Sequence, residues 1–309
     1  MKTRSVVING VKIRQRPRFK GWSTQEKVVF TIITVLFIIY SLSLLFPVYF
    51  TLINSLKSFN DMYGVGDYVE VGKNYYGFPR SWMLSNYAEA IQLEASNTKI
   101  WRMFINSVWL SSYGTVLSMI ASIFMAYALS KYRFFGSKFL YTFGIVVQII
   151  PIVGATAAAY RFIHNLDIAN NPILIGLIFF AGYDFTFIIL YGFFKSVSWS
   201  YAEAAFIDGA SNYTVLFRVM LPQALPPVIA LSITSFINRW NDYMTPFLYM
   251  DEYPTISLGI YLLGGNKDVG GGLTIFFASV IIAMLPAVLL FIIFQDVIMQ
   301  NVVAGGLKG

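Results

Sequence analysis

The chain has 309 residues, of which 57% are hydrophobic and only 12% are charged, and its mean hydropathy is +0.64. Soluble globular domains carry about 25% charged residues, so this composition excludes an ordinary soluble protein and indicates a membrane protein. Because the chain has no cysteine, it has no disulfide framework, no thiolate nucleophile and no thiolate metal site.

Long apolar stretches recur along the chain. A helix that crosses a bilayer needs roughly 20 such residues, and these stretches are too long and unbroken for barrel strands. We therefore expect an all-α membrane protein with six transmembrane helices, at residues 28–56, 103–130, 139–163, 172–195, 221–250 and 273–298. The fourth and fifth spans carry internal charges, at Asp184, Arg239 and Asp242.

The distribution of Lys and Arg predicts the orientation. One side, which includes the basic N-terminal segment 1–27, holds 14 basic residues and four acids, whereas the other side holds seven basic residues and nine acids. The positive-inside rule places both termini in the cytoplasm, so residues 57–102 form an external loop. This topology accounts for the net charge of +7 without a nucleic-acid partner. The apolar run after residue 27 is far longer than the core of a cleavable signal peptide, so the first span is expected to remain. The membrane domain is then 28–309.

A polar connection, residues 198–218, lies on the cytoplasmic side between the fourth and fifth spans. Tyr201 to Ile207 favours a helix, with Glu203 in its first turns, where negative charge suits the helix dipole. Gly209 is expected just after the helix with a positive φ, and Ser211 or Asn212 is expected to cap a second short helix through Arg218. The exposed face would include the apolar residues Ala204, Ala205 and Ile207. Such a segment either docks a soluble partner or rests on the lipid surface.

The sequence of this connection resembles a known motif. Glu203-Ala-Ala-Phe-Ile-Asp208-Gly209, continuing to Leu221-Pro222, is similar to the EAA loop of ABC importer permeases. The resemblance covers nearly the whole chain and is closest to the sugar-importing group typified by the smaller maltose-permease subunit. Further matching stretches are Asn54-Ser-Leu-Lys57, Asn106-Ser107, Ala126 to Arg133, Gln148-Ile-Ile-Pro151, Trp240-Asn-Asp-Tyr243 and the tail Val302 to Gly309.

This resemblance implies a permease subunit in the bacterial plasma membrane. It implies that the connection 198–218 contains the coupling helix, with ATPase contacts at Glu203, Ala204, Ala205, Asp208 and Gly209. The implied partners are a second permease subunit as a heterodimer, an ABC ATPase dimer and an external solute-binding protein. ATP and Mg would be bound by the ATPase subunits, with no cofactor or metal in this chain.

Two features depart from the family pattern. Ser198 stands where the family commonly has proline, so the chain is expected to bend less sharply there. The external segment Met62 to Tyr76 resembles an insertion, which either contacts the solute-binding protein or a neighbouring loop, or is a disordered loop.

Polar residues inside the spans are candidates for the solute path, because they are costly in lipid and usually face a cavity or one another. Asn238, Asn241 and Asp242 are predicted to share one helix face, with the flat ring of Trp240 beside them; Tyr183 and Asp184 add a second acceptor site. Asn and Asp bind hydroxyls, and an aromatic face covers the apolar side of a sugar ring. The alternative is a structural ion pair of Arg239 with Asp242 or Asp184.

The sequence contains no motif typical of an enzyme active site. The sequence contains no G-x-x-x-x-G-K-[ST] phosphate loop, no His-Glu-x-x-His and no Gly-x-Ser-x-Gly, so no catalytic residue is expected. The sequence does not name the solute, which could also be a polyol or a glycerol-phosphate compound. A secondary carrier or an accessory scaffold subunit are further alternatives, although we find no internal repeat of the kind that carriers show.

Overall fold

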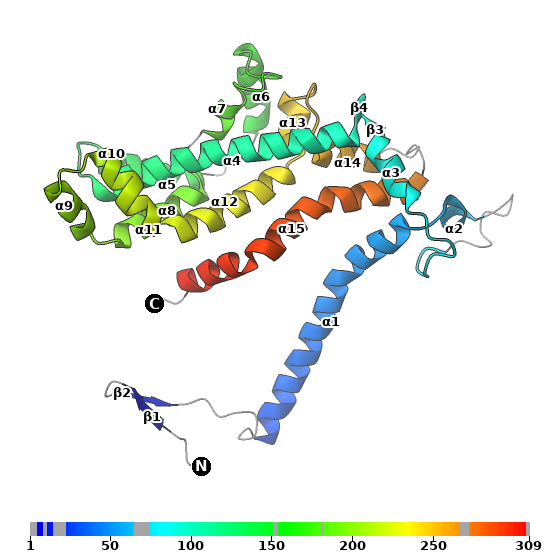
Figure 1. Ribbon diagram of the computed structural model, residues 1–309, viewed down its shortest axis with the longest axis horizontal. Coiled ribbons are helices and arrows are strands. Elements are labelled where there is room, and N and C mark those ends of the chain that lie inside the picture. The colour runs from blue at the N-terminus through cyan, green and yellow to red at the C-terminus, as the bar shows by residue number, and fades with distance from the viewer. Residues whose placement is uncertain are drawn as a thin grey trace.

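The computed structural model describes residues 5–8, 11–14, 23–64, 74–150, 154–180, 182–265 and 272–306. Side chains are described from residue 23 to residue 296 within these ranges. The larger part of the predicted insertion 62–76, and the last three residues of the tail, therefore lie outside the described residues. The described part of the chain is built mainly from helices (Figure 1).

Three helices are long and apolar enough to cross a membrane: α1 (Thr24–Ser55), α4 (Ile100–Lys131) and α15 (Gly272–Gly306), the last over Gly272–Asp296. They confirm the first, second and sixth predicted spans as continuous helices. A fourth crossing is present if the bent pair Asn212–Gln223 and Leu225–Trp240 counts as one span. The remaining elements are α2 (Phe59–Tyr63), α3 (Ser85–Gln92), α5 (Ser137–Ile149), α6 (Ala155–Asn165), α7 (Gly176–Phe179), α8 (Phe185–Ser196), α9 (Ser200–Ile207), α10 (Asn212–Thr214), a π-helix (Val215–Met220), α11 (Leu221–Gln223), α12 (Leu225–Trp240), α13 (Met244–Tyr249) and α14 (Ile256–Gly265).

The third, fourth and fifth predicted spans are not continuous helices, which corrects the sequence expectation. The third is divided into α5 and α6, with Ile150 extended, as favoured before a proline. The fourth is divided into α7 and α8 around Gly182, whose φ is 70°. The fifth ends at Trp240, and α13 follows after a turn. Hydropathy measures whether a segment is apolar, but it does not detect a local break in the helix.

Two short antiparallel hairpins correct the all-α expectation. β1 (Ser5–Ile8) pairs with β2 (Val11–Arg14) in the basic N-terminal segment, with Val6 opposite Ile13. β3 (Glu94–Ala95) pairs with β4 (Thr98–Lys99) directly before α4, in the loop that the sequence predicts to be external. Both are too short to form a layer, so the fold remains helical.

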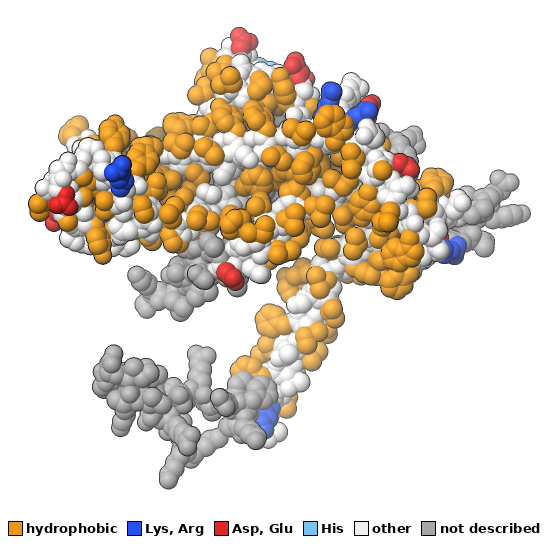
Figure 2. Space-filling view, viewed as in Figure 1, with side chains coloured by type: hydrophobic (Ala, Val, Ile, Leu, Met, Phe, Trp, Pro, Cys, Tyr) orange, Lys and Arg blue, Asp and Glu red, His pale blue; other side chains and the backbone are white. Residues whose placement is uncertain are grey.

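The long helices lie side by side. α4 packs against α8 and α12, α12 packs against α15, and α15 contacts the C-terminal end of α1 (Figure 1). Away from this contact, α1 diverges from the other helices. In the visible face of Figure 2, apolar side chains cover the middle of the molecule and most charged ones lie toward its periphery. That distribution suits a protein whose middle lies in lipid.

A buried group of polar residues lies at the C-terminal end of α1. Lys57 is fully buried, and its ammonium donates to Asn54 Oδ1 at 2.9 Å and to the carbonyls of Asn74 and Tyr75. Burial lowers the pKa of Lys57, while the charge of Asp61 raises it. These contacts attach the last residues of the predicted insertion to the end of the first span.

Candidate functional site

The connection 198–218 folds much as its local signals predict. α9 covers Ser200–Ile207 with Glu203 in its first turn, and Gly209 follows with a φ of 84°. The Ser211 side chain caps α10, accepting from the Thr214 N–H. The π-helix then leads to α11, and the axis turns by 78° between Asn212–Gln223 and α12. The connection therefore lies across the end of the helix bundle. We call residues 198–218 the coupling segment.

One side of the coupling segment is buried in the bundle and the other is exposed. Ala202, Val215, Leu216 and Met220 belong to a hydrophobic core that α4 and α8 complete. Glu203, Ala204 and Asp208 are exposed, and Ile207 is 86% exposed. Ala205 is half-buried against the core, which corrects the expectation that it belongs to the exposed apolar face.

Ser198 forms its own turn at the start of the coupling segment. Its hydroxyl accepts from the Ser200 N–H at 3.3 Å and lies 2.7 Å from the Ser200 hydroxyl. Serine side chains commonly stabilise turns in this way. Ser198 thus starts the turn with a side-chain hydrogen bond in a position where the family commonly has proline.

Asp184 is the centre of an internal polar cluster. It is the N-cap of α8, where its Oδ1 accepts from the Phe187 N–H at 2.9 Å and from the Ser122 hydroxyl at 3.1 Å. Its Oδ2 accepts from the Ser118 hydroxyl at 3.4 Å. All of these donors lie within this chain, so the carboxylate fixes the start of α8 against α4. In this conformation the carboxylate is used as a helix cap, and its predicted role as a solute acceptor stays a prediction.

Arg239 lies in the same region but forms no close ion pair. Among the described residues the only ion pair within 4.0 Å joins Arg80 and Asp61, and the Arg239 Nε has no hydrogen-bond partner. Instead, the guanidinium carbon lies 4.2 Å from the ring centroid of Phe179. The charges of Asp184 and Asp242 still act on it electrostatically. The proposed direct ion pair was wrong, and a cation–π contact holds the side chain.

The face of α4 that contacts Asp184 and Arg239 was not among the features predicted from the sequence. Small or hydroxyl-bearing residues recur along α4 at helical spacing and are all buried: Ser107, Ser111, Gly114, Thr115, Ser118 and Ser122. Small residues let membrane helices approach closely, and hydroxyls donate across the interface. The spacing was visible in the sequence as a period of three to four residues. Its partners were not visible, because they come from residues far along the chain.

Gly114 should be intolerant of even a methyl group. A Cβ there would lie 3.0 Å from Arg239 Cδ and 3.0 Å from Phe179 Cδ2. We expect Gly114→Ala to lower the free energy of unfolding by about 1–3 kcal/mol, as overpacking does. Thermal unfolding in detergent would measure the loss. Gly192→Ala is the matched control, because nothing lies within 4 Å of that position in α8; an equal loss in both variants would contradict the steric argument.

The predicted cluster at the end of the fifth span is divided by the structure. Trp240 is 2% exposed, and its indole N–H donates to the Ala283 carbonyl at 2.8 Å. Its ring packs on Phe236 and Phe104, so it cannot cover a sugar ring in this conformation. The prediction for Trp240 was therefore wrong, because its position in the sequence did not reveal a contact with α15.

Asp242 does not continue the helix face of Asn238 and Asn241. Asn241 is the C-cap of α12, whereas Asp242 accepts from the N–H groups of Met244 and Thr245 at the start of α13, at 2.9 and 3.1 Å. Asn238 and Asn241 are nevertheless exposed, as is Thr234 one turn before Asn238. These three polar side chains, at spacings of four and three, form a stripe on the outside of the subunit; we call it the α12 polar stripe.

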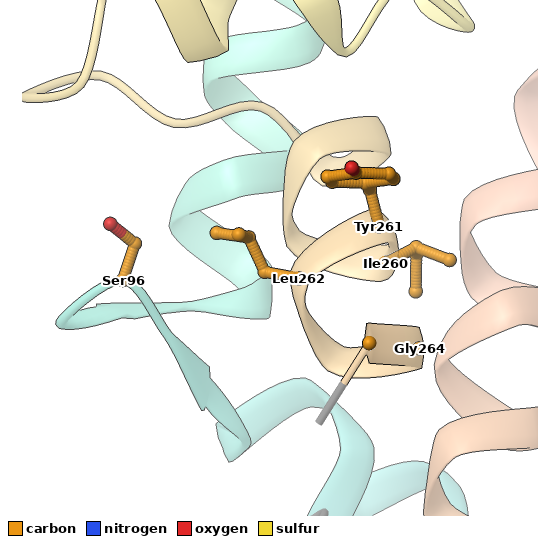
Figure 3. Close-up of a pocket in the computed structure, with 6 residues that line it drawn as sticks. Ser96, Ile260, Tyr261, Leu262 and Gly264 are labelled. Atoms are coloured by element: carbon orange, nitrogen blue, oxygen red, sulfur yellow. The ribbon is translucent and has the colours of Figure 1, made fainter. Parts of the chain in front are cut away.

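Tyr183 and an outer hollow complete the candidate residues. Tyr183 is half-buried against Gly144, and its hydroxyl has no partner among the described residues. At the C-terminal end of α14, a hollow of about 1000 Å³ is lined by Ser96, Ile260, Tyr261, Leu262, Gly264 and Gly265 (Figure 3). Tyr261 stacks on Tyr243 with the ring centroids 4.4 Å apart, which places aromatic surface near the end of α12. Among the described residues, no cluster of side chains suited to a metal ion is present.

Comparison with known proteins gives one consistent result. Residues 118–303 match the family model described as binding-protein-dependent transport system inner membrane component. The diacetylchitobiose uptake system permease protein NgcG of Streptomyces coelicolor is 27% identical, over 87% of this chain and 86% of that protein. The melibiose/raffinose/stachyose import permease protein MelC of Bacillus subtilis is 26% identical, over 90% of this chain and 96% of that protein.

The fold is also similar to that of a solved structure. A chain in the crystal structure of a bacterial ABC transporter involved in the import of the acidic polysaccharide alginate aligns with a TM-score of 0.72 and 24% identity, covering 89% of this chain and 98% of that one. The family match spans more than half of the chain and confirms the resemblance seen in the EAA-like motif. The chain therefore belongs to the family of inner-membrane components of binding-protein-dependent transport systems, as a multi-pass permease subunit of the bacterial plasma membrane that is not itself an enzyme.

Proposed function

We propose that this chain is one permease subunit of an ATP-driven ABC importer that receives a sugar or oligosaccharide from an external solute-binding protein. The carbohydrate substrate is supported by the relatives, whose names refer to diacetylchitobiose and to melibiose, raffinose and stachyose. The observation that carries the proposal is the coupling segment, which presents an exposed acidic and apolar face at the end of the bundle inside a matched permease family.

The coupling segment is where the ATPase would bind. Glu203, Ala204 and Asp208 are exposed, and Ala205 packs against the hydrophobic core. Gly209 turns the chain after α9. An exposed carboxylate in the first turn of a short helix suits a basic residue of a partner protein. ATP and Mg would then be bound by the ATPase dimer, and this chain would supply no cofactor ligand.

The topology we propose has six crossings with both termini in the cytoplasm. Three continuous helices would provide the first, second and sixth crossings, and the interrupted pairs α5–α6, α7–α8 and α11–α12 the others. Broken helices are tolerated at membrane depth where neighbouring protein covers them. In this arrangement segment 1–27 is cytoplasmic, 28–309 is the membrane domain, and 57–102 is external.

A second permease subunit would complete the assembly. The apolar stretch of α1 contributes no buried residue over its best 18-residue window, although the helix ends in a buried turn at its outer end. A helix that is apolar all round and diverges from its own bundle offers a surface to lipid and to another subunit. Purification of an active complex with this chain as its sole membrane subunit would contradict the heterodimer.

The α12 polar stripe is the proposed solute-contacting surface of this subunit. Asn238 and Asn241 are exposed, whereas Trp240 is enclosed and Asp184 and Asp242 are occupied as helix caps. The Asn238 side chain has no hydrogen-bond partner among the described residues, so its amide is available to a hydroxyl. Tyr183, with its unpartnered hydroxyl, is a second contact only if α5 moves away from it.

We expect Asn238→Ala to reduce uptake, because each hydrogen bond to a sugar hydroxyl contributes about 0.5–1.5 kcal/mol. The measurement is ATP-dependent uptake of labelled oligosaccharides into vesicles that hold the complete transporter and its solute-binding protein. Ser232→Ala is the control, since that hydroxyl bonds to the Val228 carbonyl of its own helix. Normal uptake by Asn238→Ala would show that the α12 polar stripe does not contact the solute. Uptake driven by an ion gradient without ATP would instead identify a secondary carrier.

A further inference from the structure

The cytoplasmic end of α4 forms contacts on both sides of α9, just before the coupling segment and within it. The Lys131 ammonium donates to the carbonyl of Val197, the residue that ends α8 just before the segment. The Tyr132 hydroxyl donates to Asn212 Oδ1 at 3.1 Å, at the beginning of α10. The Tyr132 ring also meets Trp199 edge to face, with centroids 5.8 Å apart. One short stretch of α4 thus contacts the segment before α9 and after it.

The same helix contacts other parts of the chain along its length. At its outer end, the Asn106 amide donates to the Pro254 carbonyl at 3.0 Å, and the Ser107 hydroxyl accepts from the Ile256 N–H at 2.8 Å. These bonds hold the beginning of α14. α4 has 32 residues without an internal break, which corresponds to a length of roughly 48 Å at 1.5 Å per residue. It therefore connects the coupling segment directly to the outer end of the bundle.

The other contacts of the coupling segment are mainly apolar, unlike the hydrogen bonds from Lys131 and Tyr132. Its buried side consists of apolar residues such as Ala202, Val215 and Leu216, and apolar contacts have no fixed direction. The chain changes direction twice, at Gly209 between α9 and α10 and again before α12, where the axis bends by 78°. Directional hydrogen bonds at Val197 and Asn212 are what fix the register of the segment on α4.

We propose that Lys131 and Tyr132 are positioning residues that lock the coupling segment to α4, so that a displacement of α9 moves α4 and the α14 region as one body. The inference rests on the proposed function, because it takes the ATPase as the source of the displacement. Hydrogen bonds at both ends of α9 prevent the segment from sliding over its apolar contacts. Loss of either bond lets α9 move while the outer end of the bundle stays in place.

The test is the number of solute molecules imported per ATP hydrolysed by the complete transporter in vesicles. Tyr132→Phe keeps the ring against Trp199 and removes only the hydroxyl, and Lys131→Met keeps the side-chain length and removes the donor. We expect both variants to assemble and hydrolyse ATP, with transport per ATP reduced about two- to tenfold, the range that one lost hydrogen bond predicts. Lys131→Arg should restore much of the ratio, because it retains a donor.

Matched controls lie close by. Tyr213→Phe removes the hydroxyl of a residue that is 73% exposed in the same segment, and Lys138→Met removes an exposed cation just beyond α4; both should leave the ratio unchanged. In the double variant Tyr132→Phe with Asn212→Ala, the losses should not add, because both changes break the same bond. Additive losses would overturn the role of this bond.

Other outcomes separate this inference from the proposed function. If the unaltered transporter shows no ATP-dependent uptake, the proposed function fails first. If it transports and both variants keep a normal ratio, the positioning role of Lys131 and Tyr132 is refuted. Variants that no longer bind the ATPase would also refute it, because they would show a purely structural contribution to docking.

Discussion

Replacing Gly209 with proline is expected to abolish solute uptake while the chain still inserts and folds. Gly209 has a φ of 84°, and its N–H donates to the Phe206 carbonyl at 3.0 Å. Proline fixes φ near −65° and has no N–H, so both features are lost. Because proline cannot adopt the φ of Gly209, the backbone must rearrange, and the lost hydrogen bond costs about 0.5–1.5 kcal/mol more. The bend that presents α9 would then change direction.

ATP-driven uptake in vesicles measures this effect, and Gly136→Pro provides the matched control. Gly136 has a φ of 88° and, like Gly209, has nothing within 4 Å of the position of a Cβ, but it lies between α4 and α5. The backbone strain is therefore similar, whereas the coupling face is untouched. Glu203→Lys should reduce uptake in the same assay by reversing the charge of that face. Normal transport by Gly209→Pro, or an equal loss at Gly136, would show that the segment is not the coupling element.

Replacing Asp184 with alanine is expected to lower the free energy of unfolding by about 1.5–3 kcal/mol, the range for the loss of a hydrogen bond to a charged group. The change removes the acceptor for the Phe187 N–H and for the hydroxyls of Ser118 and Ser122. It also removes one of the two carboxylates whose charge acts on the half-buried Arg239. Thermal or denaturant unfolding of the purified chain in detergent would measure the loss.

Asp242→Ala provides a matched comparison, because Asp242 also accepts backbone hydrogen bonds at the start of a helix. Asp242 accepts from two N–H groups at the start of α13, and the Ser257 hydroxyl donates to its backbone carbonyl. Among the described residues, no serine hydroxyl donates to its carboxylate and no ion pair joins it to Arg239. Asp242→Ala should therefore cost only about 1 kcal/mol, as a lost helix cap does. Asp184→Asn retains an acceptor oxygen and should lose less than Asp184→Ala. Equal losses at positions 184 and 242 would show that the serines and Arg239 contribute nothing.

Features that depend on residues close together in the sequence were predicted correctly, whereas features that depend on residues far apart in the sequence were not. In the coupling segment, Glu203, Gly209 and Ser211 behave as expected, because a first-turn acid, a C′ glycine and an N-cap each act within about four residues. Trp240 and Arg239 did not behave as expected, because their surroundings come from α15 and α7. Ser118 and Ser122 were overlooked because their acceptor, Asp184, is more than 60 residues away.

The sequence by itself determined that this is a membrane protein, where its long apolar stretches lie, and which family motif its cytoplasmic connection carries. Those features follow from composition and local periodicity, which the solvent and the backbone impose on any chain. Only the tertiary structure decided where the third to fifth spans break, which polar residues remain exposed on α12, and how Lys131 and Tyr132 contact the coupling segment. The physical reason is that a buried polar group must find a partner, and that partner is set by helix packing rather than by neighbours in the sequence.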